Sequence, residues 1–269
     1  MNLIKHGAIK KMGFKEFLGE VTGGIKRHNY DYQEKKSIER ELEDESDQIS
    51  ENNSSLSIAA ENKKVISTKT INTSDYFVTF SGLAKSYCVG VVDIVDSTKI
   101  CSDLQMMKVC RYYEIFLNSM AEILRHFGGT IVKNVGDSLL YYFPESAKSG
   151  RRYGFISCLE CSLAMIEAHP QINKISNEEK LPQINYRVSS DYGNVLIMKT
   201  KDFDSIDIFG PPVNMCSKIN HVAPKNTAVI GGDLYQVVRH FEDYNFNFVK
   251  DCPIGLKYSY PVYSITAKY

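Results

Sequence analysis

Neither sign of charge is in excess in this sequence of 269 residues, because 32 Lys and Arg side chains balance 32 Asp and Glu side chains. Proteins that bind nucleic acid or an anionic membrane through their overall charge carry an excess of Lys and Arg. The balance argues against both classes and predicts that nucleic acid is not a partner.

Long apolar runs are also missing. No stretch approaches the ~18 apolar residues of a membrane-spanning helix. Near the start of the chain, Lys5, Lys10, Lys11 and Lys15 interrupt any apolar segment, which is not the pattern of a secretory signal peptide. The sequence therefore predicts a cytoplasmic protein.

A complete set of zinc ligands is also missing. The chain has seven Cys residues, an odd number, and several fall inside apolar runs. Cys158 and Cys161 form a C-x-x-C, but no other pair and no His cluster completes a zinc site. We interpret the cysteines as small buried hydrophobic residues of a reducing compartment.

The first 74 residues differ from the rest. Residues 1–30 predict a short basic amphipathic helix, and contact of residues 1–28 with a membrane ranks below packing on the protein itself. Residues 31–74 include "EKKSIERELEDESDQISENNSS", a charged linker that predicts a solvated helix or disorder, because it has little apolar surface to bury. The globular domain is expected at 75–269.

From Asp75 onward, strand and helix patterns alternate. The predicted elements are a buried strand at 86–95, a helix at 102–127, two strands within 130–143 that turn at Gly136, a helix at 147–169 ended by Pro170, a hairpin at 184–198 that turns near Tyr192 and Gly193, helices at 212–223 and 232–240, and strands near 226–230, 243–249 and 260–266. This order predicts an α+β fold, a ferredoxin-like β-α-β-β-α-β sheet with helices on one face and extra C-terminal strands.

Two acidic residues mark the ends of neighbouring strands. In "VVDIVDSTKI", Asp93 ends the first buried strand, and Asp137 follows the turn at Gly136. In a β-α-β-β order these turns share one rim, where two carboxylates could bind a hard divalent cation. The backbone of residues 95–98, which includes Ser97 and Thr98, could offer N–H groups to phosphates. The alternative is that these residues only cap a helix or form a turn.

Three stretches, "DIVDST" (93–98), "KNVGD" (133–137) and "DIFGPPVNMCSK" (207–218), together resemble the class III nucleotidyl cyclases, the adenylate and guanylate cyclase family. The resemblance runs from about Tyr87 to Ile265, with the motifs in the family's order. It implies the cyclase homology domain as the fold. It also implies conversion of ATP to 3′,5′-cyclic AMP and pyrophosphate as the activity.

The resemblance implies a role for each matching residue. Asp93 and Asp137, helped by the Ile94 carbonyl, would hold two Mg²⁺ or Mn²⁺ ions. Lys133 and Asp207 match the pair that reads the base. A cation that donates to a ring nitrogen and a carboxylate that accepts from an exocyclic amine fit adenine, whereas guanine presents a carbonyl at that edge.

Three further residues follow from the same resemblance. Asn214 matches the residue that orients the ribose, and Lys218 stands where the family usually has an arginine that stabilises the transition state. Lys257 resembles a late lysine that contacts the triphosphate, although its neighbouring glycine is on the other side. Because the family divides each site between two domains and this chain has one copy of each set, a head-to-tail homodimer is implied. The dimer interface would include residues 106–113 and 212–220.

Two alternatives stay open at this point. The chain could be a cyclase-like nucleotide-binding or dimerisation module with little turnover, which Lys218 favours. It could also cyclise GTP or a pyrimidine triphosphate, because pocket shape contributes to base choice. Asp191, in "SSDYGN", is interpreted as a turn residue without a catalytic role.

Overall fold

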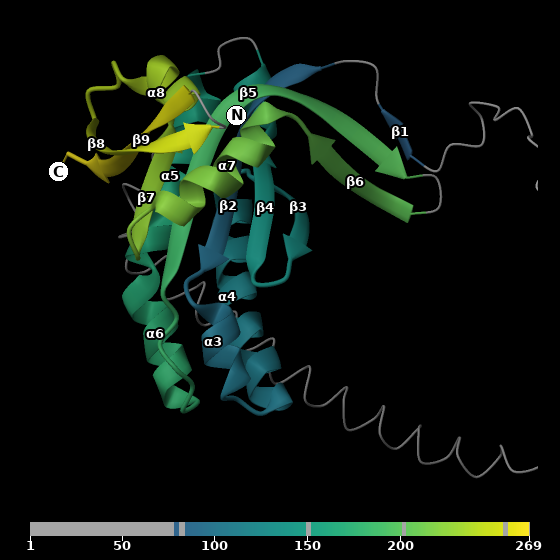
Figure 1. Ribbon diagram of the computed structural model, residues 1–269, viewed down its shortest axis with the longest axis vertical. Helices are drawn as coiled ribbons and strands as arrows, with labels where there is room; N and C mark the ends of the chain where they lie inside the picture. The colour runs from purple at the N-terminus through teal and green to yellow at the C-terminus, as the bar shows by residue number, and fades with distance from the viewer. Residues whose placement is uncertain (1–77, 81–83, 149–151, 201–202, 255–257, 269) are drawn as a thin grey trace, which may run out of the picture.

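The structure is a computed structural model that describes residues 78–80, 84–148, 152–200, 203–254 and 258–268 (Figure 1). The expectations for residues 1–30 and 31–74, and the role of Lys257, lie outside the described residues. No helix in the described ranges is long and apolar enough to cross a membrane.

The strands follow the buried and alternating apolar segments of the sequence. In chain order they are β1 (Val78–Phe80), β2 (Lys85–Ile94), β3 (Thr130–Val135), β4 (Ser138–Phe143), β5 (Tyr186–Thr200), β6 (Phe203–Phe209), β7 (Thr227–Gly231), β8 (Tyr244–Ile254) and β9 (Tyr258–Ala267). They form one sheet in the order β3-β4-β2-β5-β7-β9-β8, and β1 and β6 both pair with β5. All pairs are antiparallel except β5 with β7.

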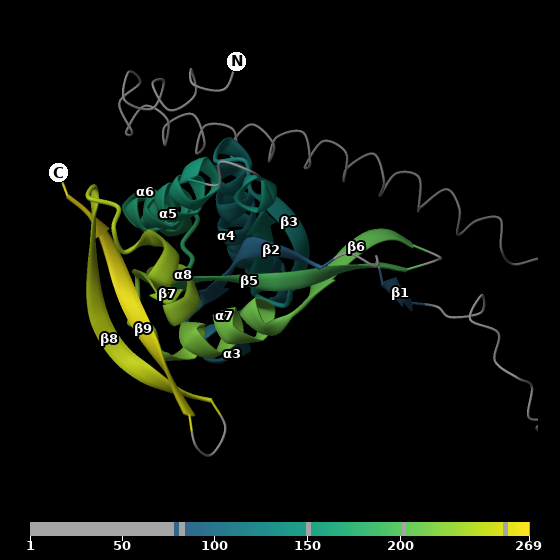
Figure 2. The same ribbon diagram turned by 90° about the horizontal axis from the view of Figure 1, so that it is seen from above.

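The helices connect these strands. They are α3 (Ser97–Ser102), α4 (Met106–His126), the 3-10 turn η2 (Pro144–Ala147), α5 (Arg152–Glu167), α6 (His169–Glu178), α7 (Pro211–Val222) and α8 (Gly232–Val238). Figure 2 shows α4, α5 and α6 on one face of the sheet and α7 on the other. The expected α+β, ferredoxin-like plan is therefore confirmed, but the expectation that all helices lie on one face is wrong for α7.

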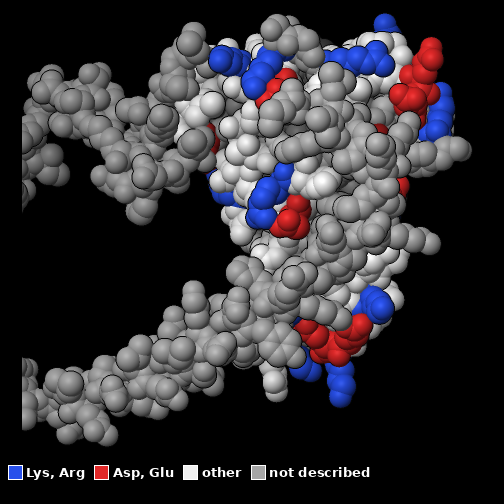
Figure 3. Space-filling model, turned by 180° about the vertical axis from the view of Figure 1, so that it is seen from behind, with Lys and Arg blue, Asp and Glu red and all other residues white. Residues whose placement is uncertain are grey.

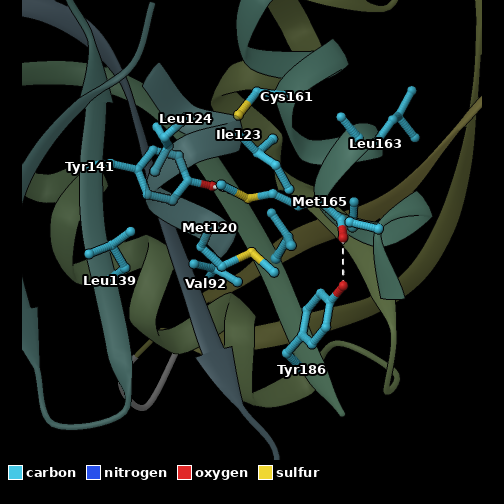
Figure 4. Packing of buried hydrophobic residues seen from close by; sticks show 14 of the residues in the cluster. Val92, Met120, Ile123, Leu124, Leu139, Tyr141, Cys161, Leu163, Met165 and Tyr186 are labelled. Atoms are coloured by element: carbon cyan, nitrogen blue, oxygen red, sulfur yellow. Dashed lines mark hydrogen bonds between the residues drawn. The ribbon is translucent and has the colours of Figure 1, made fainter. Parts of the chain in front are cut away.

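The main core lies between the sheet and helices α4, α5 and α6 (Figure 4). Tyr141 of β4 and Tyr186 of β5 are fully buried there, and the Tyr186 hydroxyl donates to the Met165 carbonyl at 2.6 Å. Gly90 of β2 leaves room for the Tyr141 ring, because a Cβ atom at that position would lie 2.3 Å from it. The close packing of the core fixes how β2 and β4, the strands that border the two acidic residues, lie together.

A smaller apolar cluster fills the opposite face of the sheet beneath α7. Helix α7 is also held by polar contacts, since the Asn220 amide donates to the Arg187 carbonyl at 3.3 Å and the Ser189 hydroxyl donates to the Cys216 carbonyl at 3.0 Å. Cys216, like Cys88, Cys158, Cys161 and Cys252, is buried. The interpretation of most cysteines as small core residues is thus confirmed.

Two predicted boundaries are wrong. The segment at 184–198 is not a hairpin, because β5 runs without a turn through Tyr192 and Gly193 and pairs with β2 along this length. Pro170 does not end the preceding helix, which stops at Glu167. Instead it occupies the first turn of α6, where a missing N–H costs nothing.

Asp191 is therefore not a turn residue. It lies inside β5 with no exposed surface, and its carboxylate accepts hydrogen bonds from the Leu234 N–H at 3.2 Å and the Tyr260 hydroxyl at 2.9 Å. The Tyr192 N–H is a third donor, at 2.9 Å. Burial raises the pKa of Asp191 to about 7. The residue joins β5 to α8 and β9.

Candidate active site

Asp93 and Asp137 come together at one end of the central strands. Asp93 is the residue before the end of β2, and it pairs across β4 with Ser138, the residue that follows Asp137. Gly136, with φ of 62°, forms the tight turn that places Asp137 there, because a left-handed conformation is easily adopted by glycine. The structure thus brings the two predicted metal-binding carboxylates to one rim.

The environment of Asp93 disfavours its charge. Partial burial and the neighbouring Asp137 carboxylate together raise the pKa of Asp93 to about 6, although His221 and Arg187 act in the opposite direction. A bound cation removes such repulsion. The carboxylate pair and the Ile94 carbonyl are oxygen donors of the kind that Mg²⁺ and Mn²⁺ accept.

The protein alone offers few ligands at this rim. Among the described residues, no group of three His, Cys, Asp or Glu side chains is placed to hold a metal ion. A cation at Asp93 and Asp137 would therefore need further oxygen ligands, and the phosphates of a nucleotide supply these in many Mg²⁺ sites. The donor set fits a metal–nucleotide complex better than a permanent structural metal.

Arg187 is a site residue that the sequence analysis missed. It pairs with Asp93 across β2 and β5. Its Nε is buried and has no hydrogen-bond partner among the described residues. A buried guanidinium nitrogen without an acceptor is costly, so it is a candidate for binding an anion. The only signal in the sequence is one arginine within an apolar strand segment, "INYRVSS".

The chain turns at the end of β2 through Asp96, which adopts a left-handed conformation with φ of 60° and ψ of 24°. Ser97, the first residue of α3, is buried, and Thr98 is exposed. The Asp96 carboxylate makes no cap with α3 and instead accepts from the Lys225 ammonium at 2.9 Å. Lys225 lowers the pKa of Asp96 below its usual range.

Lys133 and Asp207 also come together, although 74 positions separate them in the chain. The Lys133 ammonium of β3 forms an ion pair with one carboxylate oxygen of Asp207 on β6. The other Asp207 oxygen accepts from the Ile208 N–H at 2.8 Å. The two predicted base-reading side chains are thus adjacent and partly exposed.

Asn214 and Lys218 lie four residues apart on the exposed side of α7, so they share one helix face. In the described part of the chain, neither forms a hydrogen bond or ion pair with Asp93 or Asp137. The opposite side of α7, with Met215, Cys216 and Ile219, is buried against the sheet. The two residues therefore face away from their own sheet.

Charge is mixed on the described part of the face behind that of Figure 1. Figure 3 shows Lys and Arg beside Asp and Glu in small groups there. Arg111 makes a two-point ion pair with Glu179 at 2.6 Å.

The model of the adenylate and guanylate cyclase catalytic domain matches residues 81–266. The chain belongs to this family. Among similar curated proteins, an adenylate cyclase of Streptomyces coelicolor is 24% identical over 142 residues, which are 53% of this chain and 31% of that protein. A cytidylate cyclase of Staphylococcus aureus is 29% identical over 154 residues, 55% of this chain and 36% of that protein. The chain spans about a third of the length of these two relatives.

The cyclase fold is also found by comparison of structures. The adenylyl cyclase CyaB of P. aeruginosa has a TM-score of 0.63 with this chain at 17% identity, and the match covers 70% of this chain and 96% of that one. The resemblance to class III nucleotidyl cyclases and the cyclase homology fold are thus both confirmed. The roles of the individual residues stay predictions.

Proposed function

We propose that this cyclase domain converts ATP to 3′,5′-cyclic AMP and pyrophosphate. The observation that carries the reaction is the meeting of Asp93 and Asp137 at one rim, where their charges need a cation. The observation that favours adenine is the ion pair between Lys133 and Asp207. The residues of each pair come from segments that are distant in the sequence. This supports a functional site and argues against the alternative that these residues only form turns.

The rim fits two Mg²⁺ or Mn²⁺ ions. Asp93, Asp137 and the Ile94 carbonyl would hold them, together with phosphate oxygens of the substrate. When bound, such ions lower the pKa of the ribose 3′-hydroxyl and neutralise the triphosphate during in-line displacement. The protein residues bind and orient, and the two carboxylates stay ionised beside the cations.

Arg187 would contact the triphosphate. It lies directly across from Asp93 in the sheet, and its buried Nε has no acceptor in the described structure. A phosphate oxygen would supply that acceptor and form a charge-assisted hydrogen bond. The Ser97 and Thr98 segment lies at the same end of β2, where its backbone N–H groups would bind the phosphates.

The Lys133 and Asp207 pair would select bases that carry an exocyclic amine. Adenine offers its N6 amine to the carboxylate and its N1 to the ammonium. Cytosine offers an amine and a ring nitrogen in the same order, whereas guanine and uracil place a carbonyl oxygen against Asp207. The pair therefore disfavours GTP and UTP as substrates more strongly than it separates ATP from CTP.

Formation of cyclic CMP is the second candidate. The cytidylate cyclase of S. aureus has the higher identity of the two relatives, 29% against 24% for the adenylate cyclase of S. coelicolor. The amine-selective chemistry of Lys133 and Asp207 admits this substrate. Adenine remains our first proposal because the two residues resemble the family's base-reading pair and their chemistry fits adenine.

The active form would be a head-to-tail homodimer. Asn214 and Lys218 lie on the outward face of α7 and, within the described structure, form no hydrogen bond or ion pair with the two carboxylates of their own chain. They would serve the partner's Asp93 and Asp137, with Asn214 orienting the ribose and Lys218 stabilising charge in the transition state. Exposed apolar side chains support a contact surface, among them Met106, Met107, Val135 and Phe209.

The test is a product assay. The purified chain is incubated with ATP, GTP, CTP and UTP separately, each with Mg²⁺ and with Mn²⁺, and the products are resolved by mass. Asp93→Ala is the inactive variant, and Asp251→Ala, which removes an exposed carboxylate of β8, is the matched control.

Each outcome of this assay has one meaning. Cyclic AMP that Asp93→Ala abolishes and Asp251→Ala preserves supports the first proposal, and cyclic CMP supports the second. Cyclic GMP or cyclic UMP keeps the reaction but overturns the base-reading role of Lys133 and Asp207. No cyclic product from any nucleotide favours a nucleotide-binding module without turnover.

A further inference from the structure

Asp96 occupies a position that disfavours its side chain. Only three non-glycine residues in the described part of the chain have positive φ, and Asp96 is one of them. Glycine would adopt this conformation without steric cost. An aspartate that precedes a helix usually caps it, but the Asp96 carboxylate forms no cap with α3. Neither local geometry nor capping therefore accounts for the carboxylate.

Within the described structure, the carboxylate has one hydrogen-bond partner, the ammonium of Lys225, at 2.9 Å. Lys225 lies in the connection between α7 and β7, 129 positions away in the chain. Both side chains are more than half exposed. The contact thus joins the turn after β2 directly to the loop between α7 and β7.

A second set of contacts holds the loop of Lys225 in place. Asn226, which also has positive φ, donates from its backbone N–H to the Tyr186 carbonyl at 2.8 Å. Its side-chain oxygen accepts from the Tyr186 N–H at 3.2 Å, and its amide donates to the Asn185 side chain at 2.8 Å. Lys225 is therefore presented from an anchored loop.

The turn after β2 is tied to the same place. The Val95 N–H donates to the Asn185 carbonyl at 2.8 Å. Val95 and Asp96 stand between the Ile94 carbonyl and Ser97, and Tyr186 precedes Arg187. Three chain segments (95–96, 185–186 and 225–226) are thus joined, and two of them directly adjoin in sequence the residues proposed to bind metal and triphosphate.

We propose that the Asp96–Lys225 ion pair is a clamp that sets the position of residues 94–98 relative to Asp93 and Arg187. Lys225 is then a positioning residue for the cyclase reaction, which it serves through Asp96 and not by contact with substrate. This inference rests on the proposed function of the site. It explains why an aspartate occupies a left-handed turn where glycine would fit more easily.

The clamp should act on substrate binding more than on folding. An exposed ion pair contributes little to the stability of a whole domain, so melting temperatures should change little when it is removed. A small displacement of residues 94–98 should instead raise KM for the metal–nucleotide complex by about two- to fivefold, with a smaller change in kcat.

The experiment is a double-mutant cycle with Lys225→Ala, Asp96→Asn and the double variant. Asparagine tolerates the left-handed conformation, so Asp96→Asn removes the charge without adding backbone strain. Lys225→Arg keeps the ion pair and should retain the wild-type KM. Lys148→Ala removes another exposed ion pair, with Glu145 at the far end of β4, and is the control. KM, kcat and melting temperature are measured for each.

A clamp predicts that the two single variants raise KM equally and that the double variant is no worse than either, because both act on one contact. A further loss when Lys225→Ala is added to Asp96→Asn would overturn the clamp and assign Lys225 a direct contact with substrate. Unchanged KM in both single variants would also overturn it.

Failure of the proposed function is recognised separately, by a wild-type chain that forms no cyclic nucleotide. In that case the clamp is tested by amide hydrogen exchange of residues 95–100 in the nucleotide-free protein. Faster exchange there in both Lys225→Ala and Asp96→Asn, but not in Lys148→Ala, supports the clamp, and unchanged exchange overturns it.

Discussion

At the scale of single residues, Asp93 is held where its charged form is unfavourable. Burial and the Asp137 carboxylate both act against ionisation, and the pKa of about 6 reflects their sum with the opposing effect of His221 and Arg187. At neutral pH the Asp93 carboxylate is therefore mostly charged, although Asp137 lies beside it at the rim. Removing one of the two side chains relieves their repulsion. A variant at this position can therefore lose activity without losing stability.

We expect Asp93→Ala and Asp137→Ala each to lower metal-dependent cyclic nucleotide formation by at least about a hundredfold, since each would remove a proposed metal ligand. The melting temperature without metal should stay near the wild-type value or rise, because the repelling pair is gone. Activity is measured by product mass and folding by circular dichroism. Retention of activity in either variant would contradict the two-metal assignment.

Lys218 stands where the resemblance to the family places an arginine. Lysine keeps the positive charge of arginine but has no planar fork for two-point contact with a phosphoryl group. We expect Lys218→Arg to keep or raise kcat, by up to about ten- to a hundredfold. The measurement is kcat at saturating nucleotide and metal, and a large fall in kcat would mean that the pocket is adapted to lysine.

At the scale of secondary structure elements, Asp191 holds three of them together. Its folded pKa of about 7 lies above the ordinary Asp value of 3.8. The folded state therefore binds this proton more tightly than the unfolded state. The stabilisation from Asp191 is fully present below about pH 4 and is lost as the pH rises towards 7.

Asp191→Asn should accordingly remove this part of the pH dependence, whereas Asp251→Asn, on the exposed surface, should not. Tyr260→Phe should destabilise the fold by about 1–3 kcal/mol, because it deprives a buried carboxyl group of a donor. Urea unfolding at pH 4, 5.5 and 7 checks both expectations. If the free energy of unfolding of Asp191→Asn changes with pH as it does in the wild type, other groups set the pH dependence.

The sequence predicted elements well where one local signal decides. Gly136 marks the turn between β3 and β4, and the prolines at the start of α7 mark where that helix begins. It failed at β5, where Gly193 suggested a turn. The structure continues the strand there and packs α7 over it, with Pro212 at 3.4 Å from a Cβ built on Gly193. That contact is tertiary and leaves no local pattern.

The candidate site shows the same division. Asp93 and Asp137 could be placed at one rim from strand order alone, because each follows a recognisable turn or strand end. Lys133 and Asp207 were paired only through the family resemblance, since 74 positions separate them. For Arg187 the only local signal is an arginine within an apolar strand segment, because its place beside Asp93 depends on the cross-strand register.

At the scale of the whole molecule, we expect two inactive variants to complement each other. Under the proposed roles, Asp93→Ala would lack a metal ligand, and Asn214→Ala would lack the ribose contact of the neighbouring site. In a mixed head-to-tail dimer one site would lose both residues and the other would be complete. Mixing should therefore restore roughly a quarter of wild-type activity, if subunits exchange freely and each dimer forms at random.

The assay is a titration of one variant into the other after subunit exchange. Asp93→Ala mixed with Asp137→Ala is the control, because both defects then lie in the same set of residues and no site is complete. Absence of recovery in the first mixture, with dimers present, would contradict the shared site.

The ion pair between Lys133 and Asp207 has a consequence for how nucleotides compete. Before any base arrives, each of these side chains already satisfies the other. In the proposed base-reading role, an incoming base would have to separate them, and only a base that replaces both contacts would restore the interactions that were lost. In a mixture of nucleoside triphosphates, a mismatched base would leave two charges without partners and depart quickly. The Lys133–Asp207 pair would thus select among nucleotides by how long each one stays bound. The energy needed to separate the pair would also keep the affinity for the correct nucleotide modest.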